Sequence, residues 1–412
     1  MRGLRLALAF LLALWLAAAQ PAGPAAEVFA EVGQIFRELT RISGMEPHRK
    51  VACEVITREK VNTFLNQRVK EVATPEEIRG EELTLKKFGL VPPDFDLAKS
   101  TVDLLTEQAA AFYDFTRKRL YITDTAASAT RDAALVHELA HALADQNFHL
   151  DRFLKQARQS DDAALARMAV MEGQATWLMS EYMAQRMGQS LKTSPELAAM
   201  MSRSAESAAG QYPVFDGAPL YMRTTLIFPY SEGMRFQQAV VQRDGQAAFA
   251  EVFRRPPVST RQVCHPEAYF AADIPVRPPL PVFTARGYKE LTDGSFGELD
   301  HRILLEQYVG KEEAAGMAPQ WRGGRYRLYE DRARRQTVLA YASAWESPAA
   351  AARFFKLYRR VLAGKWKKMA VAAESDRRVE GTGDDGRFIL ECQGAVVTSL
   401  EGIQAPPEPG LH

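Results

Sequence analysis

The stretch Ala133–Gln146, AALVHELAHALADQ, decides how the first half of this chain folds. It contains the pattern H-E-x-x-H, formed by His137, Glu138 and His141. On an α-helix, residues four positions apart lie one above the other, so both imidazoles can bind the same ion. Glu138 is beside them, where a general base would have to be. Most of the other residues are apolar or strong helix formers, which predicts a largely buried helix over 129–146.

A second predicted helix, over 161–187, contributes an acidic residue to the same chemistry. Glu172 lies in the sequence MEGQAT, residues 171–176, among mostly apolar neighbours. A carboxylate buried there without a partner would be costly, and coordination of a metal would remove that cost. The 31 residues that separate His141 from Glu172 (172 − 141) suit two antiparallel helices joined by a loop.

These side chains match the ligands of a catalytic zinc site. Zinc takes nitrogen and oxygen ligands in a tetrahedron, and a catalytic site leaves the fourth position for water. His137, His141 and Glu172 would bind one Zn²⁺ ion. The metal lowers the pKa of the water and polarises a peptide carbonyl, while Glu138 takes the proton and passes it to the leaving amine. The alternative is a buried polar network without metal, which requires all these spacings to be coincidental.

The motifs resemble those of the gluzincin zinc metallopeptidases, whose thermolysin-like members read H-E-L-x-H-A followed by x-x-D. The sequence HELAHA at 137–142 with Asp145 fits this pattern. EGQAT at 172–176 is similar to the E-G-x-A-T element of a secreted or envelope bacterial branch. The resemblance covers about 51–270 and implies a mainly helical zincin-like domain with a small N-terminal sheet. Weaker similarity is found in FYD (112–114), FPYSEG (228–233), STRQ (259–262) and His265-Pro266.

The resemblance also implies supporting residues. Thermolysin has an aspartate four residues after its glutamate ligand, and Thr176 occupies that position here. Asp145 is then the candidate to orient a metal-bound imidazole, with a solvent-facing aspartate as the alternative. The family stabilises the developing oxyanion with a histidine or tyrosine from the following helical half, which makes His265 and Tyr230 candidates. A structural hydrogen bond for His265 and simple packing for Tyr230 are the alternatives.

Two strands are predicted directly before the first helix. Phe112 and Tyr113, then Leu120 to Ile122, flank a polar turn, which indicates a β-hairpin over 111–124. Its edge could hold an extended peptide substrate by main-chain hydrogen bonds, and an ordinary structural hairpin is the alternative. Further upstream, Thr74-Pro75-Glu76-Glu77 predicts a capped helix that runs to about Phe88.

The N-terminus predicts export. Arg2 and Arg5 precede the apolar run 6–16 and the small residues 17–19, which is typical of a signal peptide over 1–19. An uncleaved membrane anchor is the alternative. No later segment has about 20 unbroken apolar residues, so we expect no transmembrane segment in the mature chain. The protein is therefore expected to be periplasmic or extracellular, and a spacer and leading helix are expected over 20–50.

Composition excludes several classes of protein. The 412 residues are 47% hydrophobic and 25% charged, as in globular proteins large enough for two domains. Lys plus Arg number 52 and Asp plus Glu 51, so no net field favours nucleic acid, and no nucleic-acid partner is expected. Three cysteines, Cys53, Cys264 and Cys392, allow at most one disulfide.

The proline-rich segment 274–281 predicts a domain boundary. We expect a metallopeptidase domain over 51–275 and a smaller α+β domain over 283–412, so the fold class is α+β. In the smaller domain, helices are predicted over 299–310 and 347–363. Strands are predicted over 324–329, 337–343, 387–390 and 395–400.

The sequence thus predicts a secreted zinc-dependent metallopeptidase that hydrolyses peptide bonds in a peptide or protein substrate by zinc-activated water. One alternative is a catalytically silent, zinc-bearing binding or regulatory module. The other is a zinc hydrolase that acts on a non-protein envelope substrate.

Overall fold

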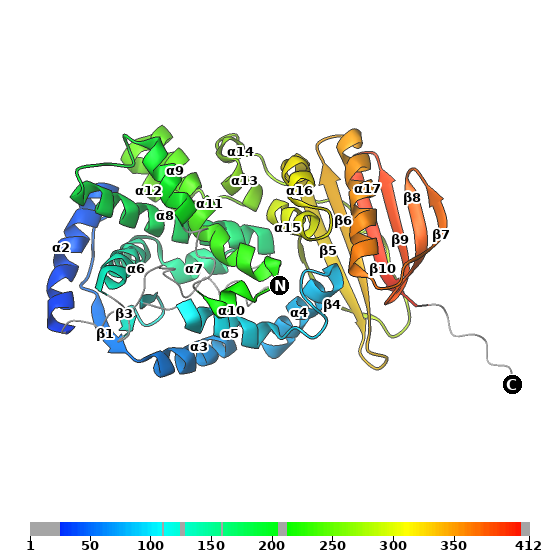
Figure 1. Ribbon diagram of the computed structural model, residues 1–412, viewed down its shortest axis with the longest axis horizontal. Helices are drawn as coiled ribbons and strands as arrows, with labels where there is room; N and C mark the ends of the chain where they lie inside the picture. The colour runs from blue at the N-terminus through cyan, green and yellow to red at the C-terminus, as the bar shows by residue number, and fades with distance from the viewer. Residues whose placement is uncertain (1–24, 109–110, 124–127, 158–159, 205–211, 405–412) are drawn as a thin grey trace. The chain divides into compact units, whose positions relative to one another are not determined.

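The computed structural model describes residues 25–404 except 109–110, 124–127, 158–159 and 205–211 (Figure 1). The predicted signal peptide over 1–19 lies outside the described residues. Within the described part of the chain, no helix is long and apolar enough to cross a bilayer. The predicted α+β class is confirmed: the N-terminal part is helical with a small sheet, and the C-terminal part is built on a large sheet.

The chain divides into two compact units. The first comprises the residues up to Ile78 together with Asp96–Asp273, and the second comprises Arg79–Phe95 together with the chain from Ile274 onward. Residues 79–95 were expected to belong to the domain over 51–275. In the structure these residues pack within the C-terminal unit.

The first unit is mainly helical. Its helices are α2 (Ala25–Ser43), α3 (Arg58–Val72), α5 (Leu97–Gln108), α6 (Ser128–Phe148), α7 (Leu150–Lys155), α8 (Asp161–Arg186), α9 (Pro195–Ser204), α10 (Pro213–Asp216), α11 (Leu220–Asp244), α12 (Ala248–Arg254), α13 (Thr260–Cys264) and α14 (Pro266–Phe270). Helix α4 (Pro75–Phe88) begins in this unit and continues in the second. The two helices predicted to hold the metal ligands are α6 and α8.

Helices α7 and α10 are short. Helix α6 runs to Phe148, and α7 begins at Leu150. The change of direction falls on His149, whose φ of 54° is left-handed. Helix α7 then buries Leu150 and Leu154, an apolar face too short to show a helical period in the sequence. Helix α10 begins at Pro213 and buries Phe215.

The predicted hairpin is confirmed and belongs to a three-stranded sheet. Strands β2 (Ala111–Asp114) and β3 (Arg119–Thr123) pair in antiparallel fashion, and β1 (Ala52–Ile56) lies parallel to β3 on the other side. Strand β2 is therefore an edge strand. Its four residues are all buried, and it contacts α6, so this edge lies against the helix that contains H-E-x-x-H.

Helices α8 and α11 approach each other most closely at two glycines. A Cβ atom added to Gly173 would lie 2.1 Å from the carbonyl carbon of Gly233, and one added to Gly233 would lie 2.3 Å from the carbonyl oxygen of Ala169. Neither position has room for a side chain. Gly173 follows Glu172 directly, so this close approach sets how near α11 comes to the predicted ligand.

The second unit is built on a seven-stranded antiparallel sheet in the order β4-β5-β6-β10-β9-β8-β7. Helices α15 and α17 contact each other and cover one face of the sheet (Figure 1). The strands are β4 (Lys289–Ser295), β5 (Trp321–Asp331), β6 (Gln336–Trp345), β7 (Ala370–Ser375), β8 (Arg378–Gly383), β9 (Gly386–Gln393) and β10 (Val396–Ile403). The helices are α15 (Glu298–Tyr308), α16 (Lys311–Met317) and α17 (Pro348–Lys365).

Strands β4, β7 and β8 and helix α16 were not predicted from the sequence. The three strands have the sequences KELTDGS, AVAAES and RVEGTG, which are polar or rich in alanine and glycine and so have little intrinsic strand preference. They become strands because each pairs with a neighbour in the sheet.

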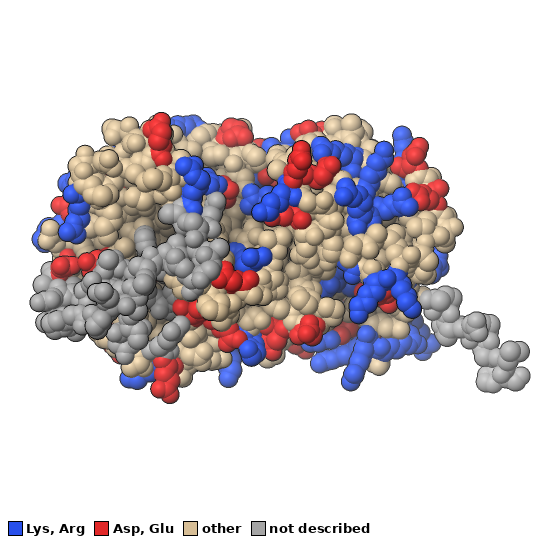
Figure 2. Space-filling view, viewed as in Figure 1, with Lys and Arg blue, Asp and Glu red and all other residues tan. Residues whose placement is uncertain are grey.

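Charged side chains of both signs are interspersed over the face shown in Figure 2. This agrees with the net charge of +1. The three cysteines are free.

The glycine contact between α8 and α11 gives the first testable prediction. Replacing Gly173 by alanine should force the two helices apart and lower the free energy of unfolding by about 1–3 kcal/mol, the usual cost of overpacking. Thermal unfolding followed by circular dichroism measures the change. Gly33, in α2, is the control, because its Cβ would meet nothing closer than 3.7 Å. Gly33→Ala should leave stability unchanged or raise it by up to about 1 kcal/mol. Equal stability of the two variants would contradict the packing argument.

Candidate metal centre

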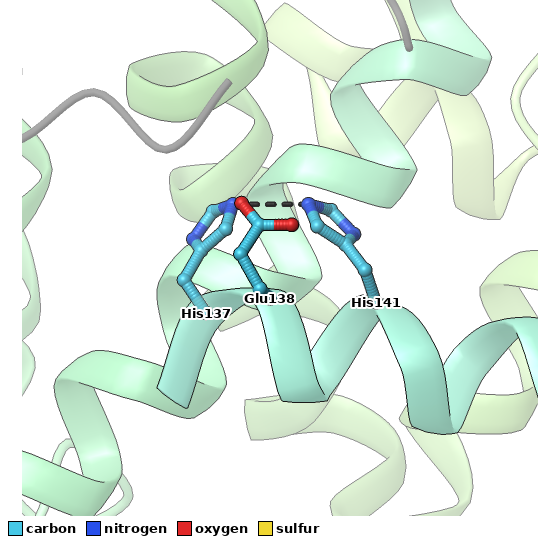
Figure 3. A group of neighbouring side chains, drawn as sticks. All are labelled: His137, Glu138 and His141. Atoms are coloured by element: carbon cyan, nitrogen blue, oxygen red, sulfur yellow. Dashed lines mark hydrogen bonds between the residues drawn. The ribbon is translucent and has the colours of Figure 1, made fainter. Parts of the chain in front are cut away.

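Helix α6 presents three chemically active side chains at one place. The imidazoles of His137 and His141 rise from the same side of the helix, with the Glu138 carboxylate between them (Figure 3). One nitrogen or oxygen atom from each residue lies within 4.8 Å of the others. The three residues are 1%, 6% and 2% exposed, respectively, so their polar atoms are largely removed from water.

Glu172 of α8 completes the group. Its Oε2 lies 3.1 Å from Nε2 of His137 and 3.2 Å from Nε2 of His141, and the two Nε2 atoms are 3.0 Å apart. Ligands at 2.0–2.1 Å from a tetrahedral zinc ion lie about 3.3 Å from one another. The three predicted ligand atoms are thus spaced almost as they would be around one ion.

Hydrogen bonds alone cannot satisfy this triangle. Each Nε2 atom carries at most one hydrogen, and an ionised carboxylate oxygen only accepts. If both imidazoles donate to Glu172, two donors face each other across 3.0 Å. If one imidazole donates to the other, the second nitrogen and the carboxylate face each other as two acceptors. A cation in the middle would attract all three atoms, so the residues fit a metal.

The protonation states of Glu172 and His137 suit metal ligands. At His141, burial is outweighed by Glu172 and Glu138, which raise the pKa of the imidazole, so zinc would have to displace a proton there. Burial opposes ionisation of Glu172, but the imidazoles of His141 and His137 outweigh it and hold the pKa of the carboxyl at about 2. Burial lowers the pKa of His137 to about 4, although its hydrogen bond to the Glu172 carboxylate acts in the opposite direction. Near neutral pH this pair is therefore an anionic carboxylate beside a neutral imidazole, the forms that bind zinc.

Strand β2 holds the candidate general base. The backbone N–H of Tyr113 donates to Oε2 of Glu138 at 2.6 Å. The other oxygen, Oε1, is buried and has no hydrogen-bond partner among the described residues. Burial raises the pKa of the Glu138 carboxyl to about 8 in the metal-free protein. One oxygen is thus anchored, and the other remains able to accept a proton.

Of the two candidates for oxyanion stabilisation, Tyr230 lies at the centre. Its ring stacks on that of His137 with 6.0 Å between centroids, and its hydroxyl hydrogen-bonds to Glu172. Burial, followed by the charges of Glu172 and Glu138, raises the pKa of Tyr230, so the hydroxyl keeps its proton. His265 lies at the junction of α13 and α14, with Nδ1 3.6 Å from the Glu267 carboxylate. This contact gives it no link to the centre.

Asp145 was expected to orient a metal-bound imidazole, but its hydrogen bonds go to other groups. Its carboxylate accepts hydrogen bonds from the Tyr113 hydroxyl at 3.0 Å, from Lys118 at 2.7 and 2.8 Å, and from the backbone N–H of Leu150 at 3.1 Å. Nδ1 of His141 is buried and has no hydrogen-bond partner in the described part of the chain. Asp145 therefore fastens the β2–β3 hairpin to α6 instead of orienting this imidazole.

Thr176 provides no replacement for the missing aspartate. Its hydroxyl oxygen is buried and has no partner among the residues that the structure describes.

Sequence reasoning missed the roles of Tyr113 and Lys118. Tyr113 was noted only as part of a strand and of a weak motif. Both contacts span more than 20 residues of sequence. A backbone N–H has no sequence signature, and a lysine in a polar turn is expected to face water. Only the paired register of β2 and β3 places them beside α6.

The STRQ motif at 259–262 has a structural role. The backbone N–H and hydroxyl of Thr260 both donate to Asp162 at the start of α8, at 3.0 and 2.6 Å. The Gln262 side chain accepts from the N–H of Val258 and donates to the carbonyl of Asp273. The Thr260 contacts fix α13 against α8.

Comparison with known proteins covers only the C-terminal part of the chain. Residues 286–409 match the model of a family described as a domain of unknown function, DUF8575. No curated protein and no solved structure matches the chain. The match says nothing about the metal centre, which lies outside it.

The centre predicts a selective effect on zinc affinity. His137→Ala, His141→Ala and Glu172→Ala should each weaken zinc binding by at least about a hundredfold, more than the roughly 10- to 100-fold loss on removing an outer hydrogen-bond partner. Glu138→Gln is the matched control and should bind zinc like the wild type. Competition with a chromophoric chelator measures the affinities. Wild-type affinity in the three alanine variants would contradict the ligand assignment.

The buried Glu138 carboxyl predicts a pH dependence in the metal-free protein. Its pKa is raised from 4.5 to about 8, so the folded state holds a proton that the unfolded chain releases. The stability that this proton contributes is fully present below about pH 4.5 and is lost as the pH rises to about 8. The Glu138→Gln variant has no carboxyl at this position, so its stability does not fall for this reason. Urea unfolding with a chelator at pH 5, 7 and 9 should show the variant gaining on the wild type up to about pH 8. A constant difference between them would contradict the prediction.

Proposed function

We propose that this protein is an exported zinc-dependent metallopeptidase whose N-terminal unit has a zincin-like fold. The observation that supports this most strongly is the triangle formed by His137, His141 and Glu172. Three buried atoms of the types that zinc prefers meet at contacts that hydrogen bonding cannot satisfy. The proposed export rests on the N-terminal sequence alone.

Zinc bound by these ligands would acidify a water molecule and polarise a peptide carbonyl. A side chain of the protein would accept the proton of this water molecule. Glu138 is held by the Tyr113 N–H through one oxygen, so its other oxygen can accept the proton of the attacking water. A nearby cation favours the ionised form of this carboxyl, which is the form that a general base needs.

Tyr230 is the better candidate for stabilising the oxyanion. Its raised pKa keeps the hydroxyl protonated, so it can donate a hydrogen bond to a developing negative charge. Its contacts with His137 and Glu172 put the hydroxyl within reach of a carbonyl polarised at the centre. The contact of His265 with Glu267 does not connect it to the centre, so we base the proposed reaction on Tyr230.

One observation favours the second candidate function, a zinc-bearing module without turnover. His137, Glu138, His141 and Glu172 are each at most 6% exposed, which leaves a substrate little access and suits a zinc ion with a structural role. A structural site, however, gives no reason for a carboxylate with one unpartnered oxygen beside the ligands. That orphan oxygen is the reason to prefer the peptidase.

Glu138→Gln separates the two functions. The amide keeps the size and the Tyr113 contact but cannot accept the proton, so cleavage should fall by at least about 10²–10⁴-fold, the usual contribution of a general base. Zinc content should stay at one ion per chain. The measurement is mass spectrometry of a diverse peptide mixture after incubation with each protein. Zinc in both proteins, with no cleavage by either, would leave the non-catalytic module or a zinc hydrolase of a non-protein substrate. Equal cleavage by both would exclude Glu138 as the base.

A further inference from the structure

The family-matched region 286–409 does not contain the whole core of its own domain. Phe88, at the end of α4, is fully buried among aromatic residues of the C-terminal unit. Its ring stacks on Phe296 at 4.2 Å and meets Tyr326 and Tyr341 edge-on at 5.7 and 5.5 Å. A central side chain of this core therefore comes from a segment far earlier in the sequence.

Ion pairs hold the same helix at both ends. Near its start, the Arg79 guanidinium contacts both carboxylate oxygens of Glu330 on β5. Near its end, Lys87 pairs with Asp385 at 3.0 Å. The Lys365 ammonium of α17 donates to the backbone carbonyl of Lys87 at 3.0 Å and also pairs with the buried Glu401 carboxylate. Mostly buried groups thus recognise both the side chains and the backbone of α4.

The end of α4 is shaped to fit against α15. Gly89 has a φ of 77°, and the N–H of Leu90 donates to the carbonyl of Leu85 at 2.9 Å, which closes the helix in a Schellman turn. The Gly89 carbonyl accepts from Tyr308 at 2.6 Å and from Gln307 at 2.7 Å. A Cβ at position 89 would lie 2.5 Å from the Tyr308 hydroxyl oxygen, so only glycine fits.

We propose that the C-terminal domain is a helix-binding module and that its occupant is Arg79–Phe95 of this chain. The module recognises a helix with a terminal phenylalanine anchor, flanking basic residues and a glycine C-cap. The segment is held by these contacts and not merely by its place in the chain. The domain that folds as a unit is therefore discontinuous, and it should stay assembled when the chain is cut between Asp273 and Ile274.

The test uses the full chain with a specific protease site inserted between Asp273 and Ile274. After complete cutting, the fragment from residue 274 onward should coelute with the N-terminal fragment in size-exclusion chromatography at micromolar concentration. Phe88→Ala should weaken the association by at least about a hundredfold, because it leaves a large cavity in the aromatic core. Arg79→Ala combined with Lys87→Ala should also weaken it, and raising the salt concentration should have less effect on this variant than on the wild type.

Lys86→Ala is the matched control. Among the described residues, the Lys86 ammonium pairs with Glu82 on the same helix, so the cut control should coelute like the wild type. Circular dichroism of each uncut variant shows whether it folds. If Phe88→Ala does not fold, the variant that combines Arg79→Ala with Lys87→Ala still tests the proposal, because its aromatic core is intact. Separation of the cut wild-type fragments would overturn the proposal. So would full coelution of both the Phe88 variant and the double variant, because other contacts would then hold the fragments together.

Discussion

Two imidazole nitrogens and one carboxylate oxygen lie within 3.2 Å of each other in the helical unit, and their hydrogens cannot satisfy all three contacts. Contacts of three helices in that unit keep these atoms together. His137 and His141 are fixed by one face of α6, and Glu172 by the close approach of α8 and α11 at Gly173 and Gly233. Burying a carboxylate beside two imidazoles costs free energy when no counterion is present. A cation bound between them would remove that cost.

The hairpin that precedes α6 provides the second half of this arrangement. On α6, Asp145 accepts hydrogen bonds from the Tyr113 hydroxyl and the Lys118 ammonium. The backbone N–H of the same tyrosine donates to Glu138. A carboxylate one turn beyond the ligands therefore sets the position of the strand that holds the candidate base. This explains how Asp145 can matter to the centre without touching an imidazole.

The sequence predicted those parts of the site that depend on local periodicity. Spacing on a helix placed His137 and His141 together, and a buried glutamate in an apolar stretch indicated Glu172 as their partner. It could not predict contacts that arise from tertiary packing, such as the Tyr113 N–H on Glu138. Asp145 was expected to orient an imidazole, because a motif gives a residue's neighbours along the helix but not those across the fold. The same limit applies to Phe88. Its helix was predicted from the sequence, but its burial in the core of the C-terminal unit was not.

The central claim is that one zinc ion lies between His137, His141 and Glu172. Zinc K-edge X-ray absorption of the purified protein tests it most directly, because the spectrum reports the type and distance of the atoms bound to the metal. The account predicts one zinc per chain with two imidazole nitrogens at about 2.0–2.1 Å, oxygen ligands at about 2.0–2.2 Å and no sulfur. A protein purified without stoichiometric zinc that also takes up none when it is added, or a spectrum with sulfur at about 2.3 Å, would contradict it.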